Sequence, residues 1–134
     1  MKKSLISTIT AVIAALILLQ TLFFKFTAHP DSVLLFTTLG LEPFGRIGIG
    51  VAELIAAILL IVPKTRGIGA VLSIGLMFGA IFSHLTKLGI VFNNDGGALF
   101  TLAVITLVAS LITAWLTRDR IPVLNKVPFL QLTS

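Results

Sequence analysis

Residues 43–63 read PFGRIGIGVAELIAAILLIVP, and this stretch decides the class of the protein. Between its two prolines, an apolar run of about 20 residues is long enough to cross the roughly 30 Å hydrocarbon core of a bilayer as one helix. Proline suits the first position of a helix and cannot continue one. Glu53 lies near the middle of the run. The segment therefore predicts a transmembrane helix with a carboxylate close to the bilayer midplane.

Three further apolar segments have a similar length. With residues 43–62 they give four predicted spans, at about 5–27, 43–62, 67–86 and 97–117. Of the 134 residues 57% are hydrophobic and 11% are charged, whereas about a quarter of a soluble domain is charged. A soluble domain of this size could not bury so much apolar surface. We therefore predict an all-α fold, a single membrane domain over residues 1–134 that forms an integral four-helix bundle surrounded by lipid.

The start of the chain has a second interpretation. Lys2 and Lys3 followed by an apolar stretch also describe a secretory signal peptide. The apolar run exceeds the roughly 7–15 residues of such a peptide, and no clear Ala-x-Ala cleavage site follows it. These features favour a first membrane span.

Charged residues predict the orientation. In a four-span arrangement the basic residues on one side are Lys2, Lys3, Lys64, Arg66, Arg118, Arg120 and Lys126. The opposite side is nearly neutral, so the positive-inside rule places both termini in the cytoplasm, with a cytoplasmic tail at 118–134. The basic clusters flank apolar runs and form no hydrophilic groove, so we expect no nucleic-acid partner. In the first outer loop, Asp31 or Ser32 is expected to cap a short surface helix from Val33 to Leu39, ended by Gly40.

Glu53 needs a physical reason for its position. A charge at the bilayer centre costs about 2.5–3.5 kcal/mol on insertion scales, and a proton, an ion pair or a wet cavity would each reduce that cost. Arg46 lies seven residues earlier on the same helix face, about 10 Å away. His84, near the end of the third span, could titrate near neutral pH or could simply cap the helix end.

The remaining polar residues have structural alternatives. Lys25 can extend to the headgroups, Asn94 or Asp95 can cap the fourth span, and Gln20 can hydrogen-bond a neighbouring helix. All the same, one set maps to the outer half of the bundle: Lys25, Arg46, Glu53, His84, Lys87 and Asp95. This set predicts an outward-opening polar pocket for proton relay or for binding an anion or the carbonyl oxygens of a quinone. No catalytic residue can be assigned, and the lack of cysteine and of clustered histidines predicts no metal site.

Small residues predict how the helices pack. Gly75 and Gly79 have the spacing that allows close helix approach. A mildly polar face of the fourth span consists of Thr106, Ser110, Thr113 and Thr117.

Several motifs together resemble the DoxX-like family of small bacterial membrane proteins. They are FTTLGLEPFGRIGIG (36–50), VAELIAAILLIVP (51–63), LMFGAIFSHLTKLGI (76–90), NNDGG (93–97) and RDRIP (118–122). The resemblance covers about residues 10–125 and implies a four-helix bundle in the bacterial cytoplasmic (inner) membrane. The family takes its name from a subunit linked to a thiosulfate:quinone oxidoreductase, some relatives are associated with oxidative-stress defence, and similar eukaryotic proteins look like chaperones.

The expected function is therefore a redox-linked subunit, or a binder of a small molecule such as a quinone or an anion. An assembly factor or chaperone, and a small oligomeric proton-coupled transporter, remain alternatives. Whether the protein is an enzyme stays open. Possible partners are other membrane subunits or further copies of this chain.

Overall fold

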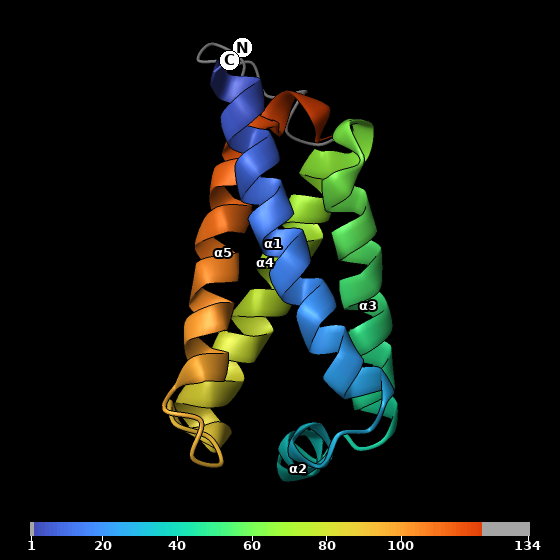
Figure 1. The fold of residues 1–134 in the computed structure, drawn as a ribbon, viewed down its shortest axis with the longest axis vertical. Coiled ribbons are helices and arrows are strands. Elements are labelled where there is room, and N and C mark those ends of the chain that lie inside the picture. The colour runs from blue at the N-terminus through green and yellow to red at the C-terminus, as the bar shows by residue number, and fades with distance from the viewer. Residues whose placement is uncertain (1, 122–134) are drawn as a thin grey trace.

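The computed structural model describes residues 2–121, and within this range the chain forms helices and turns with no strand (Figure 1). The α-helices are α1 (Lys2–Phe26), α2 (Pro30–Thr38), α3 (Phe44–Ile61), α4 (Arg66–Ser83) and α5 (Ala98–Leu116). A short 3-10 turn, η1 (Pro63–Thr65), joins α3 to α4, and a second one, η3 (Arg118–Arg120), follows α5. A π-helical turn, η2 (His84–Leu88), follows α4. Four helical stretches are long and apolar enough to span a membrane: α1, α3, Pro63–Leu88 and α5. The predicted all-helical, four-span architecture is confirmed. Residues 122–134 of the predicted tail lie outside the described residues.

The interior of the bundle is made of small side chains. Ala14, Ala57 and Ala70 are fully buried, whereas large apolar residues such as Ile58 and Phe78 are exposed on the outer surface. This pattern suits a bundle in lipid, where close backbone packing rather than water exclusion holds the helices together. The predicted polar face of α5 is buried, and Ser110 hydrogen-bonds Ser73 of α4 at 2.8 Å.

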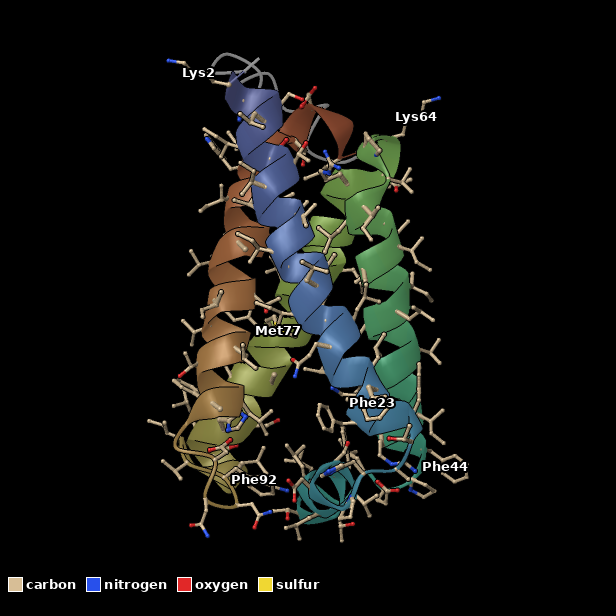
Figure 2. All side chains as sticks on the ribbon, in the orientation of Figure 1. Lys2, Phe23, Phe44, Lys64, Met77 and Phe92 are labelled. Carbon is tan, nitrogen blue, oxygen red and sulfur yellow. The ribbon has the colours of Figure 1, made fainter. Side chains whose placement is uncertain are left out.

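The four long helices form two crossing pairs. Helix α1 packs along α3, and α4 packs along α5. In the half that holds the start of α1, the pairs are joined by Thr10 to Thr113 (2.7 Å) and by Arg66 Nη1 to Thr8 Oγ1 (3.0 Å). In the other half the pairs diverge, and α2 lies across the open end (Figure 1). Figure 2 shows Lys2 and Lys64 at the closed end and Phe92 near the end that α2 covers.

Glycines set where the pairs touch. A Cβ atom on Gly69 would lie 2.6 Å from the backbone nitrogen of Leu60, so this glycine allows α4 to meet α3 closely. The predicted role of Gly75 and Gly79 in close packing is wrong, because a Cβ atom at either position would find no atom within 4 Å. Both glycines lie beyond the point where the pairs separate.

Helix α2 begins earlier than predicted. Its N-cap is His29, whose Nδ1 accepts the backbone N–H of Asp31 at 3.2 Å, rather than Asp31 or Ser32. Pro30 explains the difference, since its fixed φ suits the first helical position and it has no N–H to satisfy. Gly40, as predicted, follows the last turn with a positive φ of 74°.

Candidate functional site

A cavity of about 610 Å³ lies between the two helix pairs, in the half of the bundle covered by α2. All five α-helices contribute to its lining, which is largely apolar and reaches the level of Met77, where α1 and α4 cross (Figure 2). Its ionisable lining residues are Lys25, Asp31, Glu53, His84 and Asp95. The volume falls in the range of about 300–1,000 Å³ that is usual for small-molecule sites. The fold therefore contains a ligand-sized space in which polar groups are few.

One wall carries a buried ion pair. The Nζ atom of Lys25 lies 3.0 Å from Oε1 of Glu53, and the two side chains are 15% and 5% exposed. The hydroxyl of Thr21, one turn before Lys25 on α1, lies 3.2 Å from Oε2 of Glu53 and 2.8 Å from the carbonyl oxygen of Leu18, so its single hydrogen is shared between these two acceptors. Both carboxylate oxygens therefore have partners from one stretch of α1. Of the options open to Glu53, the structure uses an ion pair, and Lys25 points into the bundle instead of towards the headgroups.

Arg46 stands behind this wall and does not line the cavity. Its Nε donates to both carboxylate oxygens of Glu42, at 2.9 and 3.0 Å, and its Nη1 donates to the main-chain carbonyl of Lys25. Arg46 thus shares a helix face with Glu53, as predicted, but it fixes the end of α1 from which Lys25 extends. Arg46 therefore contacts the main chain at Lys25 and does not contact the cavity.

His84 forms the facing wall. It begins the π-helical turn η2, is 4% exposed, and packs edge-on against Phe100 with ring centroids 5.8 Å apart. Its Nδ1 lies 2.8 Å from the carbonyl oxygen of Gly89. A carbonyl only accepts, so Nδ1 carries the proton of this bond and Nε2 is the free ring nitrogen. No described side chain has a sealed nitrogen or oxygen without a partner, so Nε2, for which no hydrogen bond is found, keeps some accessible surface, and His84 lines the cavity.

Asp95 organises the loop that leads into α5. Its carboxylate accepts backbone N–H groups from Phe92 (3.0 Å), Gly97 (2.7 Å) and Leu99 (3.2 Å). The N-cap residue of α5 is Gly97 rather than Asn94 or Asp95 as predicted, although Asp95 still accepts an N–H group from the first turn of the helix. Burial alone would raise the pKa of Asp95, but these hydrogen bonds and the nearby His84 outweigh it and lower the pKa below the ordinary value of 3.8.

The other predicted polar positions differ from one another. Lys87 is exposed on η2 and does not line the cavity. Gln20 lines the cavity, but no hydrogen bond joins it to another described residue, so its predicted interhelical bond is wrong. Sequence reasoning missed Thr21 as a partner of Glu53. Its position four residues before Lys25 could have indicated it, because side chains one turn apart share a face.

The arrangement also agrees with the comparison to known sequences. The profile of the DoxX-like family matches residues 9–112, which include every residue that lines the cavity. The chain belongs to the DoxX-like family. No curated protein and no solved structure matches the chain. Family membership therefore supports a small multi-span membrane protein, and its activity must be argued from the cavity itself.

This DoxX-like protein presents complementary groups across an apolar space. On one wall, the Lys25 ammonium has further N–H donors beyond its bond to Glu53. On the other, His84 Nε2 accepts a hydrogen bond when the ring is neutral and donates one when it is charged. Among the described residues, no group of three His, Asp or Glu side chains could hold a metal ion. The cavity can therefore bind a compact molecule through oxygen atoms at two ends.

Proposed function

We propose that this DoxX-like protein binds a small oxygen-bearing ligand, a quinone, in the cavity between its helix pairs. The observation that carries the proposal is the Lys25–Glu53 pair on one wall opposite the free Nε2 of His84 on the other. Quinone rings have carbonyl oxygens at opposite ends, so one accepts from the Lys25 ammonium and the other meets His84. The apolar lining suits the faces of the ring.

The ion pair serves binding under this proposal by holding a hydrogen-bond donor at the cavity wall. Glu53 offsets the cost of placing the Lys25 ammonium inside the membrane, where a single cation is unfavourable. When the imidazole ring of His84 is neutral, its Nε2 accepts a hydrogen bond from a hydroxyl group of the reduced ligand. When the ring is protonated, Nε2 donates a hydrogen bond to a carbonyl oxygen of the oxidised ligand. A simple anion would use Lys25 and a charged His84 and would have no use for the apolar lining.

We further propose that the protein lies in the bacterial cytoplasmic membrane with both termini in the cytoplasm. Lys2 and Lys64 lie at the end opposite α2 (Figure 2), and Arg66 hydrogen-bonds Thr8 near the start of α1, which supports this orientation by the positive-inside rule. The cavity would then face the outer half of the bilayer, beneath α2.

The test is quinone binding by the protein purified in lipid nanodiscs, measured by titration with a benzoquinone and by extraction of any co-purified quinone. We expect binding in the wild type and at least about a tenfold loss of affinity in Lys25→Met and in Glu53→Gln, the equivalent of about 1.4 kcal/mol. Lys87→Met is the matched control, because it removes the same charge from an exposed position outside the cavity. Absence of binding by the wild type, or equal affinity in Lys25→Met and Lys87→Met, would overturn the proposal.

A further inference from the structure

The cavity does not end inside the bundle, because its lining continues around α4. Ser73 and Met77 mark the buried face of that helix. Gly75 lies two residues from each of them, which places it roughly 160° around the helix from both. Gly79 lies one turn further along, and both glycines are exposed and line the cavity. The open space therefore extends from the bundle interior to the surface of α4 that faces lipid.

This extension passes between α3 and α4. The flank of α4 involved carries Gly69, which touches the backbone of α3 in the closed half of the bundle, and Leu76, which lines the cavity two turns further on. Beyond that contact the helices separate, and Ile49 and Glu53 line the cavity from α3. A Cβ atom at Gly75 or Gly79 would meet no atom within 4 Å. We name the part of the cavity that is lined by Ile49, Gly75 and Gly79 the glycine portal.

The cavity also has a chemical direction. The inner walls of the cavity carry Lys25, Glu53 and His84. His84 is only 4% exposed. The glycine portal has no side-chain polar atom at its two glycines and opens within the apolar span of α4. An apolar group leaving through it would pass directly into hydrocarbon without desolvating a polar group.

We propose that the ligand of this cavity is a tailed amphiphile, with its oxygen-bearing ring between Lys25 and His84 and its hydrocarbon tail leaving through the glycine portal into the bilayer. The inference rests on the proposed quinone-binding function and adds the class of ligand and the path of its tail. It also gives the two glycines a role, since any larger side chain there would occupy the space that the tail needs.

The experiment compares two probes that share one benzoquinone ring, one with no tail and one with a decyl chain. Both are titrated against the wild type, Gly79→Leu and Gly48→Leu in lipid nanodiscs. Gly48 is the matched control because it is an exposed helical glycine on α3, has no atom within 4 Å of a Cβ position and lies outside the cavity lining. At both positions an added Cβ atom would have no atom within 4 Å, and both substitutions replace glycine by a better helix former.

We expect Gly79→Leu to lower the affinity for the decyl probe at least about tenfold, because the new side chain overfills the path of the tail. Its affinity for the tail-less ring should change less than about twofold, and Gly48→Leu should match the wild type for both probes. Equal decyl affinity in Gly79→Leu and the wild type would overturn the tail path and leave quinone binding standing. Equal losses for both probes would also overturn it, since the glycine would then shape the ring site. Binding of neither probe by the wild type would overturn the proposed function itself.

Discussion

The Lys25–Glu53 pair gives the sharpest test of the site, because removing its two members should have unequal effects. Lys25→Met deletes the ammonium but keeps the length of the side chain, leaving the carboxylate of Glu53 with Thr21 as its described partner. Glu53 lies in the middle of α3 and is 4% exposed, too far from either end of the helix for its short side chain to extend to the headgroups. In Glu53→Gln, by contrast, Lys25 lies in the last turn of α1, and its side chain can extend to the headgroups. Lys25→Met should therefore destabilise the protein more.

The magnitude follows from the geometry. Two unit charges 3.0 Å apart attract by roughly 5–6 kcal/mol at an effective dielectric constant of about 20. Desolvation of the two ions offsets much of this attraction, so the intact pair adds little net stability. Removing one partner of a buried pair is different and costs about 3–5 kcal/mol. We expect that loss for Lys25→Met, about 1–2 kcal/mol for Glu53→Gln, and a double variant within about 1–2 kcal/mol of the wild type.

The assay is equilibrium unfolding by SDS in mixed micelles, followed by far-UV circular dichroism and by the fluorescence of Trp115, the only tryptophan in the sequence. The single losses sum to about 4–7 kcal/mol and the double variant loses at most about 2 kcal/mol, so the double-mutant cycle should give a coupling free energy of at least about 2 kcal/mol. Lys87→Met, at an exposed position, should stay within about 0.5 kcal/mol of the wild type. Additive losses in the double variant would refute the pairing of Lys25 with Glu53.

Three further predictions follow from other parts of the fold. Gly69→Ala should destabilise by about 1–3 kcal/mol, since its Cβ would meet the α3 backbone, whereas Gly75→Ala should stabilise by about 0.5–1 kcal/mol; SDS unfolding distinguishes them. The folded-state pKa of Asp95 lies below 3.8, so its carboxylate stabilises the fold above that pH and this contribution is lost as the pH falls through the folded value. Asp95→Ala should cost about 1–2 kcal/mol at pH 7 and weaken the acid dependence of the unfolding midpoint, a difference that an unchanged pH profile would contradict. The chain has no cysteine, so single cysteines can be introduced as labelling sites. A cysteine at Asn94 should react with an impermeant maleimide from the periplasmic side, whereas a cysteine at Lys64 should react only after lysis. The reverse labelling would contradict the proposed orientation.

Much of the site was visible in the sequence as residue types. Glu53 stood out because a carboxylate in mid-span is costly, and Lys25, His84 and Asp95 were assigned to the same half of the bundle. Their places in the cavity lining agree with that assignment. What could not be predicted was which cation reaches Glu53. Helical spacing favoured Arg46 on the same helix, but the partner came from α1, because the crossing of α1 over α3 brings Lys25 within 3.0 Å.

The glycines also show that spacing along one helix does not predict contacts between helices. The GxxxG spacing of Gly75 and Gly79 is a local pattern, and it predicts close packing only if a neighbouring helix lies against that face. In the structure the neighbour has already diverged, and Gly69 makes the close contact instead. The cap of α2 was also predicted at the wrong residue: Asp31 or Ser32 was expected, but Pro30 takes the first helical position and His29 therefore becomes the N-cap.

The sequence by itself determined the four spans, the end that gathers the basic residues, and the presence of an acid in mid-span. These properties depend on the length and polarity of each segment by itself and need no contact between segments. Only the tertiary structure decided that Glu53 pairs with Lys25, that Arg46 instead bonds Glu42 and the main chain of α1, and that the half of the bundle covered by α2 opens into a cavity. Those features depend on the angle at which two helix pairs cross, and that angle is set by contacts between residues far apart in the chain.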